Sequence, residues 1–141
     1  MARKIADEIR DQVRRRANLL CEYCHTDERW QYVRFTMDHV TPGGESSAEN
    51  LALACFHCNR RKSDKIDSLD PETKQIVQIF NPRRHVWKEH FEWSADGLRI
   101  VPKTPIGRAT VNLLELNRAR ILFIREADVA VNRHPPVDDL T

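Results

Sequence analysis

The sequence lacks any apolar stretch long enough to cross a membrane, because its longest apolar runs are only Leu51 to Phe56 and Ile121 to Ile124. Its N-terminus, MARKIADEIR, has neither the apolar segment nor the small-residue cleavage site of a secretory signal. We therefore expect a cytoplasmic protein without a membrane partner. Disulfides are then not expected, because the cytosol keeps thiols reduced.

An excess of charge of one sign is also missing. The chain of 141 residues has 23 Lys and Arg against 21 Asp and Glu, a formal net charge of +2. A charge this small does not by itself indicate a nucleic-acid partner. Hydrophobic residues make up 40% and charged residues 31% of the chain, as in ordinary globular proteins. The length predicts one domain with extensions.

The first half of the chain has the periodicity of a helix, two strands and a second helix. Apolar residues at intervals of four predict a helix over residues 3–19. Alternation predicts a strand over residues 32–39, and a short apolar run predicts its partner over residues 50–55. A loop rich in Pro, Gly and Ser, residues 41–47, joins them. A helix follows over about residues 58–66.

The second half predicts a mixed extension. Asp70 before a proline predicts the N-cap of a helix over residues 70–80. A Ser-Ala-Asp-Gly turn predicts a hairpin that pairs residues 87–93 with residues 98–101. The aromatic residues on its first strand suit a core face or a base-stacking platform. Two further helices are predicted, one capped by Thr104 and extending to Leu116, the other capped by Asn117 and extending to Ala127.

These elements predict a small α+β fold in three segments. Residues 1–69 form the core with its N-terminal helix, and residues 70–128 form an extension packed on that core. Residues 129–141, with two adjacent prolines and two adjacent aspartates, are expected to be a disordered tail.

Four cysteines occur as two Cys-x2-Cys pairs, Cys21/Cys24 and Cys55/Cys58. This is the ligand set and spacing of closed tetrahedral zinc sites. Two disulfides are the first alternative, which a reducing compartment disfavours. Four unrelated buried thiols are the second, which the paired spacing disfavours. The sequence therefore predicts a structural zinc ion, and such an ion alone is equally typical of a non-catalytic zinc ribbon.

Between and after the cysteine pairs lie Asp38, His39, Asn50 and Asn59. Asp38 and Asn59 offer the oxygen ligands that a hard divalent cation prefers. His39 can accept a proton from water near neutral pH, although its place on the apolar face of the strand also suits a core histidine. Asn50 suits either a loop brace or a residue that orients His39. Asp38 could instead cap the end of the strand.

A basic cluster directly follows Asn59. Such a run is usually a solvated helix face, but this one adjoins the candidate site, so we predict that it contacts nucleic-acid phosphates. Lys62 is expected to make the leading contact. The cluster consists of Arg60, Arg61, Lys62 and Lys65.

Four segments carry a family resemblance: Cys-Glu-Tyr-Cys, Asp-His-Val-x-Pro, Glu-Asn-Leu-Ala-Leu-Ala-Cys and Cys-Asn-Arg-Arg-Lys. Together they resemble the HNH endonucleases over residues 21–66. The resemblance implies a zinc-bound, treble-clef-like ββα-metal core that nicks nucleic acid with one magnesium-class ion, Mg²⁺ or Mn²⁺. It implies that His39 is the first H and the base, that Asn50 is the N, and that Asn59 stands where the last H is usual. Asp38 is then a metal ligand.

The function that we predict from the sequence is metal-dependent hydrolysis of DNA phosphodiester bonds. A ribonuclease is one alternative, since nothing in the motif reads the sugar. A non-catalytic zinc module that binds nucleic acid is the other, and it would be favoured by the loss of Asp38, His39 or Asn59. All three residues are present.

Overall fold

The computed structural model describes residues 4–140, which divide into two compact units. Within the described range, the first comprises residues 4–66 together with Asn81–His85, and the second comprises Asp67–Phe80 together with residues 86–140. The mixture of helices with small sheets confirms the predicted α+β class. The predicted segment boundaries stay predictions. No helix within the described range has both the length and the hydropathy that a membrane crossing requires.

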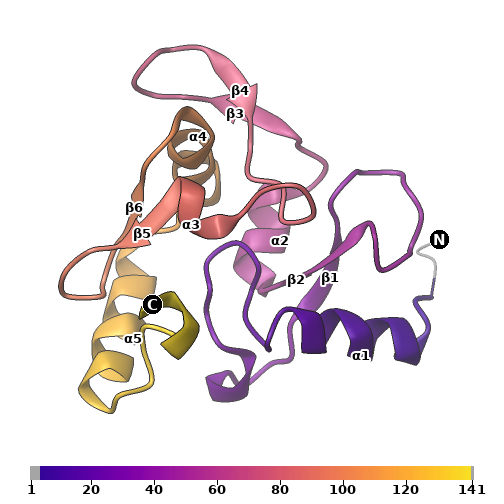
Figure 1. Cartoon of the computed structure of the whole chain (residues 1–141), viewed down its shortest axis with the longest axis horizontal. Coiled ribbons are helices and arrows are strands. Elements are labelled where there is room, and N and C mark those ends of the chain that lie inside the picture. The colour runs from indigo at the N-terminus through magenta and orange to yellow at the C-terminus, as the bar shows by residue number, and fades with distance from the viewer. Residues whose placement is uncertain (1–3, 141) are drawn as a thin grey trace. The chain divides into compact units, whose positions relative to one another are not determined.

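The first unit is built around a two-stranded antiparallel sheet and one helix (Figure 1). Thr36 pairs with Ala54 at one end of the sheet and His39 pairs with Leu51 at the other. Every residue of the second strand is buried, so this strand forms the centre of the small core. The elements are α1 (Asp7–Arg16), the 3₁₀ turn η1 (Glu28–Trp30), β1 (Thr36–His39), β2 (Leu51–Ala54) and α2 (Phe56–Lys62).

Strand β1 begins four residues later than the sequence predicts. Tyr32 and Val33 are exposed, and the backbone N–H of Phe35 donates to Glu28 Oε2 at 2.6 Å instead of joining the sheet. The buried guanidinium of Arg14 pairs with the same carboxylate at 3.2 Å. Strand β2 ends at Ala54, the partner of Thr36, so the segment before β1 has no strand to pair with. The buried ion pair of Arg14 and Glu28 holds that segment instead.

Helix α1 is fastened to the start of β2 by its last residue. Arg16 donates from Nη1 to the carbonyl oxygen of Ala48 at 2.8 Å and from Nη2 to that of Leu51 at 2.7 Å. The segment Asn81–His85 joins this unit through an ion pair of Arg83 with Glu22. Arginines here hold together a unit that is too small to rely on apolar burial alone.

The second unit contains two antiparallel hairpins and two longer helices (Figure 1). The β3–β4 hairpin contacts α4, and so does β6. The elements are β3 (Asp67–Leu69), β4 (Ile76–Gln78), α3 (Trp87–His90), β5 (Phe91–Trp93), β6 (Ile100–Pro102), α4 (Pro105–Leu114), α5 (Ala119–Ala130) and the 3₁₀ turn η2 (Val137–Leu140).

The helix predicted over residues 70–80 is wrong, because this segment forms the turn and second strand of the β3–β4 hairpin. The Asp70 carboxylate accepts from the Glu72 N–H at 3.0 Å and from Thr73 Oγ1 at 2.8 Å, which closes a tight turn instead of starting a helix. Arg108 on α4 donates twice to it at 2.9 Å. Those bonds hold the pKa of Asp70 well below its usual range.

The caps of the last two helices differ in outcome. Thr104 caps α4 as predicted, and its Oγ1 accepts from the Gly107 N–H at 3.0 Å. The cap predicted at Asn117 is wrong, because α5 begins at Ala119 and its N-cap is Arg118. The Asn117 side chain instead pairs with both backbone groups of Ile100 at 2.8 Å, which ties the helix connection to β6.

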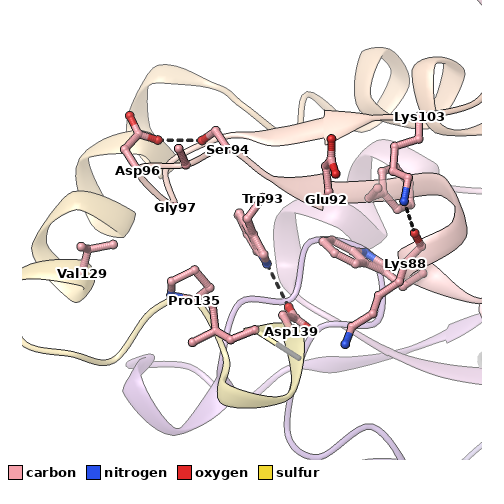
Figure 2. A pocket seen from close by; sticks show the side chains of 14 residues that line it. Lys88, Glu92, Trp93, Ser94, Asp96, Gly97, Lys103, Val129, Pro135 and Asp139 are labelled. Atoms are coloured by element: carbon pink, nitrogen blue, oxygen red, sulfur yellow. Dashed lines mark hydrogen bonds between the residues drawn. The ribbon is translucent and has the colours of Figure 1, made fainter.

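The segment after α5 lies against an aromatic cluster of the second unit (Figure 2). The sequence predicts disorder for residues 129–141, whereas α5 continues to Ala130. Beyond it the His134 ring packs edge-on against the Trp93 ring, with the ring centroids 4.4 Å apart. The Asp139 carboxylate accepts a hydrogen bond from Trp93 Nε1 at 2.9 Å. The Trp93 indole thus gives the segment after α5 an apolar face to pack on and a hydrogen-bond donor. The sequence of residues 129–141 alone does not reveal this partner.

Candidate functional site

The four cysteines converge at one buried point of the first unit. Their Sγ atoms all lie within 4.8 Å of one another, and Cys24 and Cys55 are 3.7 Å apart. Tetrahedral zinc with Zn–S bonds of about 2.3 Å holds its sulfurs roughly 3.8 Å apart. The cluster therefore fits a single zinc ion, and all four thiols are free of disulfides.

The first cysteine pair lies in a tight turn that follows α1. The turn is closed by hydrogen bonds from Cys21 N to Thr26 O and from His25 N to Cys21 O, both 2.9 Å long. Burial raises the pKa of the Cys21 thiol, while hydrogen bonds from the neighbouring thiols lower that of Cys24. Each of these sulfurs binds a metal only as a thiolate.

The second cysteine pair opens α2. Cys55 is the N-cap residue, and its Sγ accepts from the Cys58 N–H at 3.4 Å. This places Asn59 in the first turn of the helix, next to a thiol of the cluster. The helix begins at Phe56, two residues before the sequence predicts.

Asp38 is buried between two donors. Tyr23, which lies between the first two cysteines, donates from its hydroxyl to Asp38 Oδ2 at 2.6 Å. Lys62 Nζ donates to Asp38 Oδ1 at 3.3 Å and to the carbonyl oxygen of His39 at 3.2 Å. Burial raises the pKa of the Asp38 carboxyl, and the Lys62 ammonium opposes that rise.

His39 lies at the end of β1 on the wall of an open hollow. Its ring is half-buried, and Nε2 lies 2.9 Å from Ser46 Oγ. Asp38 and Asn59 line the same hollow, which has a volume of about 600 Å³. These three residues therefore border one space at the end of β1. We call this space, the candidate catalytic site, the active-site hollow.

The two asparagines hold different positions. Asn59 lines the active-site hollow, and its Nδ2 donates to Thr36 Oγ1 at 2.7 Å. Asn50 instead closes the loop after β1: its Oδ1 accepts from the Thr41 N–H at 2.9 Å, and its Nδ2 donates to the carbonyl oxygens of Thr41 and Glu45 at 3.1 and 3.0 Å. The structure therefore brings Asp38, His39 and Asn59 together and places Asn50 as a loop brace.

One family model matches this chain, and its description is HNH endonuclease. The match covers residues 19–65. The match includes both cysteine pairs and all residues of the active-site hollow, and so confirms the resemblance read from the motifs. This match indicates a role as a nuclease or in nucleic-acid binding. No curated protein and no solved structure matches the chain.

The basic cluster of the HNH domain is divided between surface and interior. Arg60, Arg61 and Lys65 are exposed, as phosphate contact would require. Lys62, expected to make the leading contact, is only 1% exposed and pairs with Asp38. Its ammonium is directed inward because a buried carboxylate needs a counter-charge more than a solvated phosphate does.

Sequence reasoning missed one residue of the HNH domain site, Tyr23. It is fully buried, and both burial and the charge of Asp38 raise its pKa well above the usual value. The hydroxyl therefore stays protonated and donates to the carboxylate. The sequence did offer one indication: Tyr23 is a large aromatic residue between two metal ligands, where a tight turn would favour a small one.

Proposed function

We propose that the protein is a metal-dependent endonuclease that nicks DNA, with zinc held by the four cysteines as a structural ion. The observation that carries this proposal is that Asp38, His39 and Asn59 line one open hollow. A carboxylate and an amide can hold a divalent metal, and an imidazole can serve as general base, which together suit metal-assisted phosphodiester hydrolysis. The zinc ligands lie in a separate, closed site with no open position for substrate.

His39 is the base in this proposal. Imidazole exchanges a proton near neutral pH, the range in which a water must be deprotonated for attack on phosphorus. The bond between Nε2 and Ser46 Oγ holds the ring. In the tautomer in which Nε2 donates to Ser46, Nδ1 is the nitrogen that accepts the proton. Lys62 holds the backbone of His39 in place through its carbonyl oxygen.

Asp38 and Asn59 are the proposed ligands of a magnesium or manganese ion. Oδ2 of Asp38 accepts a hydrogen bond from Tyr23 and Oδ1 accepts one from Lys62, and each oxygen has a second lone pair. Asn59 uses its Nδ2 toward Thr36, so its carbonyl oxygen remains for a hard cation. Such an ion, when bound, supplies positive charge for the phosphate and the leaving oxygen.

Exposed positive charge beside the hollow suits the negatively charged backbone of the substrate. Arg60, Arg61 and Lys65 are exposed on or just after α2, the helix that carries Asn59. Contacts of this kind fix the position of a nucleic acid without reading its sequence. They also make affinity fall as salt rises.

Incubation with supercoiled plasmid tests the proposal directly. Protein washed free of loosely held metal should convert plasmid to nicked circles after addition of magnesium or manganese, and not without it. Nicked rather than linear product is expected because one HNH site cuts one strand. A matched RNA substrate separates a deoxyribonuclease from a ribonuclease. Binding without cleavage of either substrate would favour the non-catalytic zinc module.

Replacing Gly44 with alanine should slow nicking by roughly tenfold, an effect of the size expected when a positioning loop shifts. A Cβ at Gly44 would lie 2.6 Å from Asn50 Nδ2 and 3.0 Å from the carbonyl oxygen of Thr41. Asn50 must then leave the loop that carries Ser46, the partner of His39. Plasmid nicking measures the rate, and thermal unfolding should remain close to wild type. Wild-type nicking by Gly44→Ala would contradict the role of Asn50 as a brace.

A further inference from the structure

A second hollow of the HNH domain adjoins the active-site hollow. It has a volume of about 410 Å³ and is lined by Thr36, Phe56, Asn59, Arg60 and Ser63. Asn59 and Ser63 also line the active-site hollow. The two spaces therefore share a wall, and a nucleic-acid strand with one phosphate in the first would extend its neighbouring nucleotide into the second.

The chemistry of the second hollow matches a nucleotide. Phe56, the first residue of α2, is 65% exposed although it is aromatic. Arg60 follows it by four residues, so the two side chains lie on the same face of the helix. An exposed ring can stack on a base of any sequence, and a guanidinium can pair with a phosphate. Single exposed apolar residues are common, but Phe56 borders the same space as a proposed metal ligand.

We propose that this second hollow is a base-binding subsite, in which the nucleotide next to the cleaved bond stacks on Phe56 while Arg60 holds its phosphate. The proposal rests on the proposed function, because it takes the cleaved phosphate to lie at Asp38 and Asn59. Bases in a duplex already have both faces covered by their neighbours, so a base must leave the stack to reach Phe56. The preferred substrate class is therefore DNA with an unpaired nucleotide beside the cleaved bond.

Binding of bulged DNA tests the subsite independently of cleavage. Two labelled duplexes carry one extra unpaired nucleotide, which is thymine in the first and an abasic residue in the second. Fluorescence anisotropy without added divalent metal measures both affinities while the DNA stays intact. Wild type should bind the thymine bulge on the order of tenfold more tightly, the size of one base-stacking contact.

Three variants assign the preference to Phe56. Phe56→Ala should lose it, and Phe56→Trp should keep it because the indole also stacks. Phe123→Ala is the matched control, since Phe123 is also an exposed phenylalanine, at 74%, but belongs to α5 in the second unit. This control should behave as wild type. Zinc content and thermal unfolding, measured for each variant, establish that its fold is intact.

The outcomes separate this proposal from the nuclease assignment. Equal binding of the two bulges by wild type would overturn the subsite, as would a preference that survives in Phe56→Ala or disappears in Phe123→Ala. Plasmid nicking is a separate measurement. A base preference that depends on Phe56 in a protein that never nicks would support the subsite and refute the nuclease, whereas nicking without that preference would do the reverse.

Discussion

His39→Ala should lower the rate of plasmid nicking by roughly 100-fold or more, the usual effect of losing a general base. Folding should be unaffected, because the ring is only half-buried and its hydrogen bond is to Ser46 in a surface loop. Zinc content and divalent-metal binding should also persist, since His39 is neither a thiol of the cluster nor a proposed ligand. Single-turnover nicking at saturating manganese measures the chemical step.

Asp38→Asn is the comparison variant, because it separates the loss of a metal ligand from the loss of the base. An amide is a weaker ligand than a carboxylate for a hard cation, so the manganese concentration at half-maximal rate should rise in this variant. High manganese should partly restore its rate and should not restore that of His39→Ala. If His39→Ala nicks at the wild-type rate, His39 is not the base. If both variants respond alike to manganese, the separation of base from metal ligand is wrong.

Cys58→Ser should unfold the HNH domain rather than slow it. The Cys58 thiol is fully buried among the other three, and structural zinc sites contribute about 10–16 kcal/mol of apparent binding free energy at neutral pH. That is comparable to or larger than the whole stability of an ordinary domain, about 5–15 kcal/mol. Circular dichroism and thermal unfolding should show loss of cooperative structure, and elemental analysis should find about one zinc per chain in wild type and far less in the variant.

Removal of zinc from the wild-type protein provides the control for this variant. A strong chelator should unfold the HNH domain, and added zinc should refold it, because the thiols are intact. The same addition should not rescue Cys58→Ser. A variant that is well folded and free of zinc would refute the structural role of the ion, and so would a wild-type protein that is folded and contains no zinc.

The elements that sequence reasoning predicted well are those determined by neighbouring residues. The spacing within Cys21/Cys24 and Cys55/Cys58 limits each pair to a tight turn, so each half of the zinc site follows from local geometry. The order of strand, strand and helix follows from hydrophobic periodicity. Thr104 before a proline determines the start of α4, because a side-chain cap needs only the next three residues.

The elements that it missed depend on partners far along the chain. The Asp70 carboxylate has the same local signals for a helix cap and for a turn, and Arg108, 38 residues later, binds it in the turn. Asn117 could cap a helix, but pairing with Ile100 uses both its donor and its acceptor. The local sequence cannot tell a helix cap from a turn or a tertiary contact when the partner residue comes close only on folding.

The candidate site also has features that follow from the sequence and features that only the tertiary structure determines. The residue types at Asp38, His39 and Asn59 and their place beside the cysteine pairs were determined by the sequence alone. Only the tertiary structure decided that Lys62 is directed to Asp38 instead of to solvent, and that Tyr23 connects the cysteine cluster to that carboxylate. The physical reason is burial: a carboxylate that is 3% exposed needs donors around it, and which side chains supply them depends on packing in three dimensions.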